Sequence, residues 1–376
     1  MAIEKLDILR FLEMAKDYPV LDVRSPAEYN HAHIPGAFNL PLFSDEQRKE
    51  IGTIYKQQNR KDAIKIGLKY FGPIMLQMVE KVEALIEKRP LNIKNGIDKP
   101  QTSNTVLVHC WRGGMRSAAV AWLLDLYGFK VFSLIGGYKK FRHYVLESFL
   151  HPYNFKVVGG YTGSGKTHVL KELERNGKAI IDLEHLAHHK GSAFGALGQP
   201  LQPSQEMFEN KLALELMQAI QTDSDDNGDD YHGYIFNKSI WIEDESQRIG
   251  KINLPQPIWA RMRGSQLYFL DIPFEERLNH IITEYGNLDS EKMVNAIIRI
   301  RKRLGGLETK NAINALIEGN LEECFAILLS YYDKWYSKGL NNRDNLDSCL
   351  TKIPCMKVAP PYNARLLLQV FAPSNV

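Results

Sequence analysis

Residues 104–117, NTVLVHCWRGGMRS, decide the fold of the first part of the chain. The apolar, β-branched run that ends at His109 predicts a buried strand, and the loop that follows contains two consecutive glycines. MRSAAVAWLLDLYG over 115–128 predicts a helix that ends at Gly128. A strand, a glycine-rich loop and a helix in this order are typical of an α/β domain.

Three other short apolar runs predict strands of the same sheet, namely PVLDVRS at 19–25, AFNLP at 37–41 and KVFSLIGG at 130–137. A long helical insertion at 44–90 precedes the strand that leads to the glycine loop, and a further helix is expected at 139–151. Strands that alternate with helices indicate a mostly parallel sheet covered on both faces. We assign this first domain to residues 1–145.

GYTGSGKT at 160–167 is a second glycine-rich loop, and it lies between an apolar strand, FKVVGG, and a helix predicted at 166–176. This context makes the match to a P-loop specific. Lys166 would reach the outer phosphates of a ligand, and Thr167 would bind a Mg²⁺ ion. The backbone N–H groups that would point at the phosphates belong to Gly160, Gly163, Ser164 and Gly165.

The chain continues the α/β pattern through a second domain, which we assign to residues 152–376. Strands are expected at 178–184, 239–246 and 266–273. From about residue 289 the domain is expected to be mainly helical. Two apolar segments near its end are expected to add short strands, IPCMKVA at 353–359 and RLLLQVFAP at 365–373.

Cys110 is the residue with the clearest chemical context in the first domain. Backbone N–H groups at a helix N-terminus and nearby arginines lower the pKa of a thiol, and Arg112 and Arg116 flank this one. Gly113 and Gly114 allow the N–H groups of the loop to turn inward as an anion nest, and Arg116 offers a planar fork to an oxyanion. The alternative is that Cys110 is a small buried hydrophobic residue, as most free cysteines are.

The composition excludes several classes of protein. The 376 residues include 47 Lys and Arg, 44 Asp and Glu and only four Cys, and the cysteines lack the spacing of a disulfide framework or a zinc site. The first residues lack the order of a signal peptide, and no apolar run is long enough to cross a membrane. We therefore expect a protein of the reducing cytoplasm, with Cys324, Cys349 and Cys355 serving only in packing.

The net charge of +3 conceals basic segments that an acidic loop at 223–230 offsets. Residues 51–72 carry five basic side chains against Asp62, and residues 299–303, RIRKR, carry four cations in five positions. Such segments can contact the phosphate backbone of a nucleic acid, although a solvated helix face is the commoner explanation of a single run.

Other polar and aromatic groups are weaker candidates. Asp182, Glu243 and Asp244 end predicted strands of the second domain, where a carboxylate can hold metal-bound water or substrate. DSDDNG at 223–228 resembles half of a calcium loop but lacks the required glutamate, so we interpret it as a surface loop. The histidines 185, 188 and 189 have no strict ligand pattern, and we interpret the Tyr and Trp cluster at 331–336 as packing residues.

The segment LDVRSPAEYNHAHIPGA at 21–37 and the loop HCWRGGMRS resemble the rhodanese family. The resemblance implies that Cys110 carries sulfur or selenium as a persulfide or its selenium analogue. It also implies that Asp22, Arg24 and Glu28 form a framework near the site. The loop from Cys110 to Arg116 is one residue longer than in simple sulfurtransferases and has the C-x5-R spacing of phosphatases with the same fold, which suits a tetrahedral, phosphate-sized donor.

A rhodanese-like domain followed by a P-loop domain resembles the tRNA 2-selenouridine synthase family over nearly the whole chain. IDLEHLAHHKGSAFG and IWIEDESQRIG also resemble that family. The resemblance implies a reaction on the wobble uridine of the tRNAs for Lys, Glu and Gln. There, 2-thiouridine is S-geranylated from geranyl diphosphate, and selenium from selenophosphate then replaces the geranylthio group. A protein that supplies selenophosphate is a further implied partner.

Two other functions remain open on the residues alone. The Cys110 loop, followed by Ser117, fits a rhodanese-fold cysteine phosphatase fused to a P-loop nucleotide-binding domain. Alternatively, the chain is a nucleotide-binding regulator whose first domain senses anions or oxidants. That alternative predicts tight binding of ATP or GTP and no affinity for tRNA, and the basic segments count against it.

Overall fold

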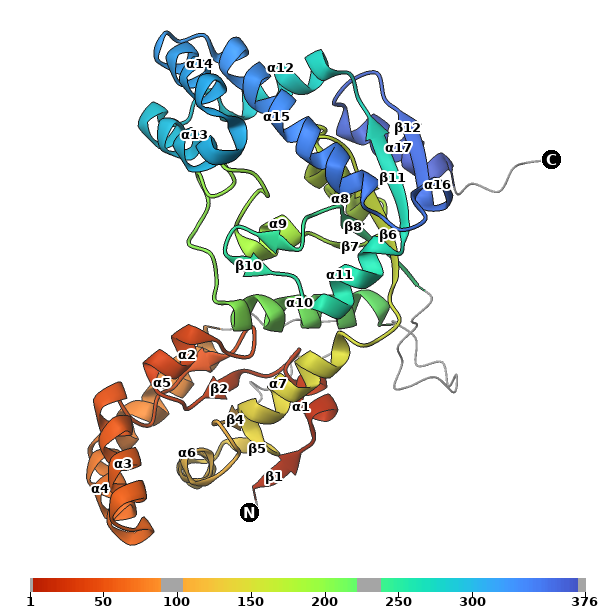
Figure 1. Cartoon of the computed structure of the whole chain (residues 1–376). Helices are drawn as coiled ribbons and strands as arrows, with labels where there is room; N and C mark the ends of the chain where they lie inside the picture. Colours follow the sequence, from red (N-terminus) through yellow and green to blue (C-terminus); the bar gives the residue numbers. More distant parts are fainter. Residues whose placement is uncertain (1–2, 89–103, 222–237, 371–376) are drawn as a thin grey trace, which may run out of the picture. The chain divides into compact units, whose positions relative to one another are not determined.

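The computed structural model describes residues 3–88, 104–221 and 238–370 (Figure 1). The chain divides into two compact units, Met1–Glu147 and Ser148–Val376. Each unit contains its own five-stranded sheet, in which all neighbouring strands are parallel. The predicted α/β fold is therefore confirmed. The calcium-like segment 223–228 lies outside the described residues.

The sheet of unit 1 has the strand order β1-β5-β4-β2-β3. The strands are Glu4–Leu6 (β1), Val20–Asp22 (β2), Phe38–Asn39 (β3), Thr105–His109 (β4) and Lys130–Leu134 (β5). Four of them lie where the apolar runs predicted strands. The sequence did not reveal β1, since only Leu6 of its three residues is buried. The register pairs Asp22 with His109, so the ends of β2 and β4 lie side by side.

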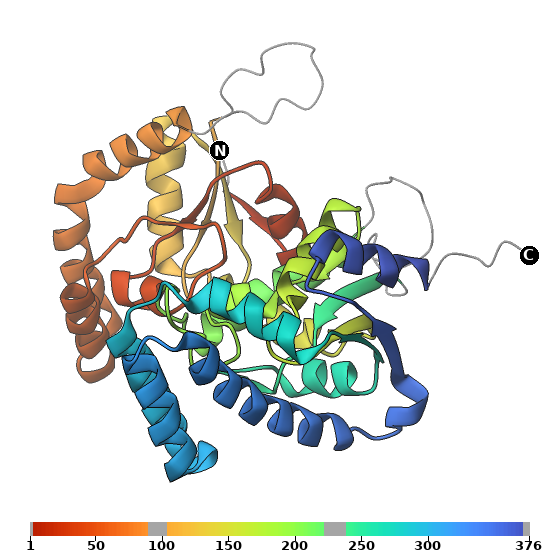
Figure 2. The same ribbon diagram turned by 90° about the horizontal axis from the view of Figure 1, so that it is seen from above.

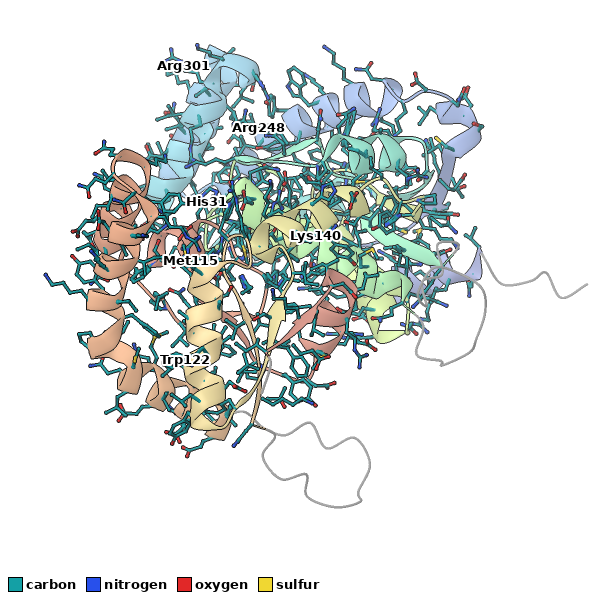
Figure 3. The ribbon with its side chains drawn as sticks, turned by 90° about the horizontal axis from the view of Figure 1, so that it is seen from below. His31, Met115, Trp122, Lys140, Arg248 and Arg301 are labelled. Atoms are coloured by element: carbon teal, nitrogen blue, oxygen red, sulfur yellow. The ribbon has the colours of Figure 1, made fainter. Side chains whose placement is uncertain are left out.

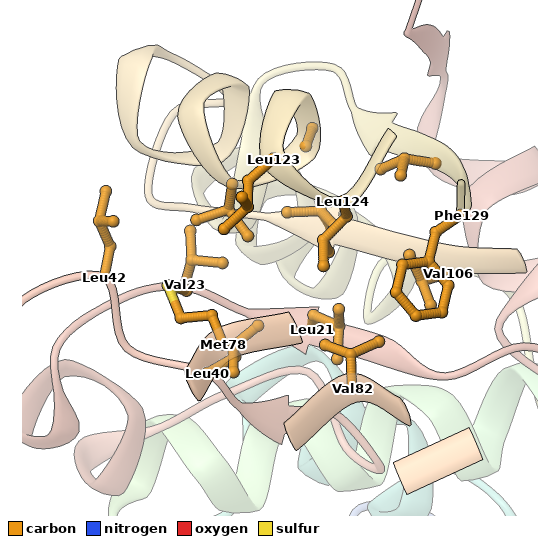
Figure 4. Close-up of a cluster of buried hydrophobic side chains, with 14 of the residues drawn as sticks. Leu21, Val23, Leu40, Leu42, Met78, Val82, Val106, Leu123, Leu124 and Phe129 are labelled. Carbon is orange, nitrogen blue, oxygen red and sulfur yellow. The ribbon is translucent and has the colours of Figure 1, made fainter. Parts of the chain in front are cut away.

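Helices cover this sheet, and the insertion before β4 is helical as predicted. The helices are Ile8–Met14 (α1), Pro26–His31 (α2), Asp45–Gln57 (α3), Arg60–Phe71 (α4), Met75–Glu87 (α5), Met115–Tyr127 (α6) and Gly137–Ser148 (α7), with a 3-10 turn at Gly72–Ile74 (η1). Met78 and Val82 of α5 and Leu124 of α6 pack with Leu21 and Val106 of the sheet (Figure 4). Each such fully buried side chain contributes about 1.5–3 kcal/mol.

The sheet of unit 2 has the strand order β12-β11-β6-β8-β7, and a small antiparallel pair lies apart from it. Its strands are Asn154–Gly159 (β6), Ala179–Ile181 (β7), Ser239–Glu243 (β8), Gln266–Asp271 (β11) and Leu350–Pro354 (β12), and the small pair is Arg248–Ile249 (β9) with Ile252–Asn253 (β10). The central strand β6 leads into the P-loop. Its neighbour β8 ends at Glu243, which the register pairs with Val158.

The helices of unit 2 include two that cover one face of the sheet and a group that forms a separate core. They are Lys166–Arg175 (α8), Leu183–Ala187 (α9), Gln205–Ile220 (α10), Gln256–Arg263 (α11), Phe274–Tyr285 (α12), Ser290–Leu304 (α13), Gly306–Ile317 (α14), Leu321–Asn341 (α15), Leu346–Cys349 (α16) and Pro360–Gln369 (α17). Leu170 of α8 and Leu367 of α17 pack with Val158 and Leu270 on one face. The strand predicted at 365–373 is wrong over residues 365–369, because two prolines at the first helical positions start α17 instead. Residues 371–373 lie outside the described residues.

Helices α13 to α15 form the helical C-terminal part that the sequence predicted from about residue 289, and α12 packs with them. Their apolar faces make one cluster around Met293, Ala312 and Phe325. Figures 1 and 2 show α13 and α14 projecting away from the sheet of this unit as a pair. Arg277 of α12 donates to both carboxylate oxygens of Asp333 on α15 at 3.0 and 2.8 Å, which joins the two helices. None of the helices in the described ranges is long and apolar enough to span a membrane.

Candidate functional site

Both glycine-rich loops leave the carboxyl end of an inner parallel strand and lead directly into a helix. The thiol loop, residues 110–116, connects β4 to α6 in unit 1, and the phosphate loop, residues 160–167, connects β6 to α8 in unit 2. Ligands of open α/β sheets bind at the carboxyl ends of the strands. The fold therefore places each predicted loop where its unit can present a site.

The Cys110 thiol is buried and faces a hydroxyl and several backbone amides. Its Sγ lies 3.3 Å from Oγ of Ser117, and that hydroxyl lies 3.0 Å from the carbonyl oxygen of Gly114. Burial alone would raise the pKa of Cys110, but hydrogen bonds from Ser117 and from the amides of Arg112 and Gly114 lower it below the ordinary value. The surroundings of the sulfur therefore favour the thiolate form of Cys110 more than burial alone would.

The start of α7 forms hydrogen bonds with the backbone of the thiol loop. The amides of Tyr138 and Lys139 donate to the carbonyl oxygens of Cys110 and Trp111 at 2.8 and 2.9 Å. A Cβ atom on Gly137, whose φ is +59°, would overlap the Cys110 carbonyl oxygen. Glycine is required here because the two segments approach too closely for a side chain.

Arg116 lies against Glu28, and Arg112 is exposed. The Nη1 and Nη2 atoms of Arg116 donate to the two carboxylate oxygens of Glu28 at 2.6 and 3.3 Å. Burial would raise the pKa of Glu28, but the hydrogen bond and charge of Arg116 lower it. The guanidinium of Arg116 therefore already binds a carboxylate. To bind an oxyanion as predicted, it would have to contact both anions or release Glu28.

A buried ion pair supports the thiol loop from β2. Arg24 donates to Asp22 through Nε at 3.0 Å and through Nη2 at 2.6 Å, and its guanidinium lies 3.8 Å from the ring centroid of Tyr138. Burial would raise the pKa of Asp22, but the hydrogen bonds and charge of Arg24 lower it below the ordinary value. Burial lowers the pKa of His109 and outweighs the charge of Asp22, which would raise it. Breaking such a buried pair costs about 3–5 kcal/mol.

The phosphate loop contains three glycines with positive φ, at 160, 163 and 165. A Cβ atom on Gly163 would lie 2.9 Å from the carbonyl oxygen of Arg277, so α12 packs directly on the loop backbone. Lys166 donates to the carbonyl oxygen of Gly160 at 3.2 Å, and the Gly160 amide donates to the Tyr336 hydroxyl at 3.2 Å. The predicted loop geometry is present, with Lys166 folded back over the loop.

The carboxylates beside the phosphate loop are arranged in a chain that begins at Thr167. Its hydroxyl donates to Glu184 at 2.9 Å, and the Glu184 amide donates to the buried Glu243 at 2.8 Å. Burial raises the pKa of Glu184, raises that of Glu243 strongly, and raises that of Glu245 to about 8. Asp182 accepts the amide of His185 at the start of α9.

Asp244 has two protein partners of its own. The Tyr336 hydroxyl donates to one of its oxygens at 2.6 Å, and Arg343 forms an ion pair with the other. Of the three carboxylates that the sequence proposed for this site, Asp182 and Asp244 line the cavity described next, whereas Glu243 lies beneath it, fully buried.

A cavity of about 590 Å³ lies over the phosphate loop. Besides the loop, it is lined by polar groups that include Glu184, Glu245 and Lys190. The rest of its wall is apolar and aromatic and comes mainly from α12 and α15, through Ile281, Phe325, Leu328, Leu329, Tyr332 and Trp335. One cavity thus combines phosphate-binding groups with a hydrocarbon surface.

Both units of the chain resemble known proteins. The profile of the tRNA 2-selenouridine synthase AAA domain matches residues 153–352, and that of the rhodanese-like domain matches residues 8–144. A tRNA 2-selenouridine synthase of Bdellovibrio bacteriovorus is 31% identical over 87% of this chain and 90% of the relative, and one of Marinobacter nauticus is 32% identical over 87% and 89%. This chain belongs to the tRNA 2-selenouridine synthase family.

The family resemblance that the sequence suggested is therefore confirmed. Another family member, from Nitrosomonas europaea, is 34% identical, and its match spans 72% of this chain but only 64% of the relative's own length. The family profiles cover both glycine-rich loops. Roles for individual residues of the loops remain predictions.

Sequence reasoning missed several residues that this family member brings to the phosphate loop, namely Glu184, Tyr336 and Arg343. Glu184 follows Asp182 by two residues, so its position just after a predicted strand could have indicated it. Tyr336 lies 176 residues from Gly160, and no local pattern connects them. His185 lines the cavity, and no cluster of three or more possible metal ligands occurs among the residues that the structure describes.

Proposed function

We propose that this chain converts 2-thiouridine at the wobble position of tRNA into 2-selenouridine, in two steps that use the two loops. Its family relatives carry the name tRNA 2-selenouridine synthase, which supports a tRNA-modifying enzyme. The substrates proposed are the tRNAs for Lys, Glu and Gln, in a reducing cytoplasm that keeps Cys110 as a thiol.

The first proposed step is S-geranylation from geranyl diphosphate at the phosphate loop. The sulfur of 2-thiouridine forms a bond to C1 of the geranyl group, the C1–oxygen bond breaks, and diphosphate leaves with the electron pair. N3 of the base loses its proton to the solvent. The amides of the phosphate loop and Lys166 would offset the negative charge that develops on the leaving diphosphate. Lys166 would exchange its present contact with the Gly160 carbonyl for a phosphate oxygen.

The cavity is the observation that carries this step. Beside its polar groups, this cavity includes the apolar side chains of Phe325, Leu328 and Leu329 in the same wall as the phosphate loop. Burial of a hydrocarbon chain contributes about 0.8 kcal/mol for each CH₂ group. A ligand with a diphosphate at one end and a ten-carbon apolar chain therefore matches both parts of the wall.

A Mg²⁺ ion fits the residues beside the phosphate loop. Mg²⁺ is bound through one or two protein oxygen ligands together with substrate phosphates. Thr167 and Glu184 present a hydroxyl and a carboxylate that already lie 2.9 Å apart, and they would hold the ion. The ion would supply charge neutralisation for the leaving diphosphate.

The second proposed step is selenation at the thiol loop, with Cys110 as the nucleophile that releases selenium from selenophosphate. The Cys110 thiolate would attack the phosphorus atom, the phosphorus–selenium bond would break, and selenide would leave with the electron pair to attack C2 of the base. Selenophosphate would bind with its phosphate end at the amides of Gly113 and Gly114, aided by Arg112 and Arg116. Overall the C2–sulfur bond of the geranylated base breaks and a C2–selenium bond forms. Geranylthiol leaves, and water takes up the phosphoryl group as phosphate. A separate protein would supply the selenophosphate.

Mass spectrometry of nucleosides tests the proposal. Thiolated tRNA incubated with the chain and geranyl diphosphate should yield the geranylated nucleoside, and addition of selenophosphate should yield 2-selenouridine. Absence of the geranylated nucleoside would contradict the first step. Rapid hydrolysis of a generic aryl phosphate, dependent on Cys110, would instead support the phosphatase alternative.

A further inference from the structure

Trp335 of α15 is an exposed aromatic ring at the edge of the cavity. It lines the cavity and yet is 43% exposed, which distinguishes it from the buried apolar residues of the same wall. Two cations bracket its ring: the Arg303 guanidinium lies 5.6 Å and the Lys338 ammonium 5.3 Å from the ring centroid. Tyr331 packs edge-on against it at 6.3 Å.

Arg303 belongs to a basic stripe along α13. Lys292, Arg299 and Arg303 are spaced by seven and four residues, so they lie on one face of the helix, and all three are exposed. Among the described residues, none of the three forms an ion pair with a carboxylate. Arg301 lies on the opposite face, near the end of the helix (Figure 3).

Helix stability alone does not explain this stripe. Cations in the last turn complement the helix dipole, which accounts for Arg301, Lys302 and Arg303. Lys292 lies in the first turn, where a cation opposes the dipole. A row of cations that continues from the first turn to the last, and ends at an exposed tryptophan, is complementary to a chain of phosphates and bases.

The apolar chain of a prenyl donor is a poor occupant for the face of Trp335. Covering this ring with hydrocarbon would remove water from Arg303 and Lys338 without giving them a partner. The buried part of the wall, at Phe325, Leu328 and Leu329, has no such cost. A nucleotide offers a π-face to the ring and a phosphate to the flanking cations at the same time.

We propose that Trp335, bracketed by Arg303 and Lys338, is a stacking platform for an unpaired base of the tRNA anticodon loop. The stripe of Lys292, Arg299 and Arg303 binds the adjoining backbone phosphates. This inference rests on the proposed function, because that function requires a single tRNA base to reach the cavity over the phosphate loop. Stacking at the edge of the cavity holds the loop open beside the prenyl donor.

The test measures the affinity of the full chain for a thiolated anticodon stem-loop RNA at several KCl concentrations, with no donor present. Trp335→Ala should weaken binding roughly 10-fold, since stacking on an aromatic ring supplies that order of free energy. Trp335→Phe should retain most of the affinity. Arg299→Gln combined with Arg303→Gln should weaken binding and reduce the slope of log K against log salt by roughly 0.7 for each lost phosphate contact.

Two matched controls separate the platform from general effects. Trp122 lies on α6 (Figure 3) and is 51% exposed. Trp122→Ala should leave RNA affinity unchanged. Arg301→Gln removes the same charge from the opposite face of α13 and should leave the salt slope unchanged.

Each outcome is decisive because the assay needs no catalysis. RNA affinity that is absent in the wild type, or unchanged in both the Trp335→Ala and the double-arginine variants, overturns the platform. A higher KM for geranyl diphosphate with unchanged RNA affinity in Trp335→Ala also overturns it, by assigning the ring to the donor. The wild-type chain could also fail to prenylate tRNA while these variants still lose RNA affinity. That result would support the platform and contradict the proposed function.

Discussion

The thiol loop and the phosphate loop have the same strand–loop–helix backbone arrangement but carry different side chains. Each follows an inner parallel strand, contains at least one glycine with positive φ and opens a helix. The thiol loop surrounds a buried sulfur with N–H groups, whereas the phosphate loop has Lys166 and opens on a cavity of about 590 Å³. In the proposed function, the side chains that each loop carries, more than its backbone, would determine whether it favours a nucleophile or holds a leaving group.

The buried carboxylates next to the two loops differ in their cation partners and in the direction of their pKa shifts. Asp22 is paired with Arg24 and its pKa is lowered, chiefly because these interactions outweigh burial. Glu243 has no cation partner among the described residues, and burial raises its pKa. The first is therefore charged in the folded protein, and the second favours its protonated form.

The largest expected effect is the loss of stability in Asp22→Asn. The substitution leaves Arg24 buried without its counter-charge and should lower the free energy of unfolding of unit 1 by about 3–5 kcal/mol. Glu243→Gln, the matched amide in unit 2, should cost about 1 kcal/mol or less, because it replaces a largely neutral group. Urea unfolding followed for each unit measures both, and equal losses would contradict the charge assignment.

The Asp22 contribution also has a defined pH dependence. Because the folded pKa of Asp22 lies below its ordinary value of 3.8, the stabilisation is complete above that value. It is lost as the pH falls through the lowered folded pKa. Acid titration of Asp22→Asn should therefore show a weaker loss of stability at low pH than titration of the wild type.

Lys166→Ala should reduce the rate of geranylation roughly 100- to 1000-fold, because it removes a preorganised charge from the leaving diphosphate. Single-turnover assays with thiolated tRNA measure this rate. Lys171→Ala, which removes another cation that lines the cavity from outside the phosphate loop, should have a much smaller effect. A Lys166→Ala variant with the wild-type rate would remove the phosphate loop from the mechanism.

Gly137→Ala should destabilise unit 1 by roughly 1–3 kcal/mol and impair the thiol loop, since a Cβ atom would meet the Cys110 carbonyl in a left-handed backbone conformation. Gly128→Ala is the matched control: its φ is +113°, but no atom lies within 4 Å of the added carbon. Thermal unfolding and alkylation of Cys110 should separate the two. Similar alkylation rates in both variants would indicate that close contact with α7 does not shape the loop.

The smallest expected effect is a shift in the pH profile of thiol alkylation. Iodoacetamide should modify Cys110 at a lower pH than an ordinary thiol, because its pKa is lowered. Burial raises the pKa of Cys324 and Cys355 to about 11, so these thiols should stay unreactive near neutral pH. Ser117→Ala removes a hydrogen bond to the sulfur and should move the Cys110 profile to higher pH. An unmoved profile would assign the effect to the backbone amides alone.

Much of the fold could be predicted from the sequence because its signals are local. Apolar runs of four to six residues and the glycines that follow them identified β4, β6 and the two loops. Strand β1 escaped detection because it is a short edge strand whose first two residues are exposed. Residues 365–369 were wrongly predicted as a strand because an apolar run does not by itself distinguish a strand from a helix.

The candidate site was less predictable where it depends on distant segments. Local patterns identified Cys110, Lys166 and Thr167. The hydroxyl of Tyr336 reaches the phosphate loop from α15, whereas its place in an aromatic cluster predicted only a packing role. Arg116 was expected to face the anion nest, but it is held by Glu28, a residue from α2 that only tertiary folding brings near. Such pairings depend on the arrangement of helices around the sheet.

The central claim is that each loop carries out one step of the reaction. Its most direct test uses Cys110→Ser and Lys166→Ala with mass spectrometry of the tRNA nucleosides. Given thiolated tRNA, geranyl diphosphate and selenophosphate, Cys110→Ser should accumulate the geranylated nucleoside. Given geranylated tRNA and selenophosphate, Lys166→Ala should complete selenation. Completed selenation by Cys110→Ser, or failure of Lys166→Ala on the geranylated substrate, would contradict the assignment of one step to each loop.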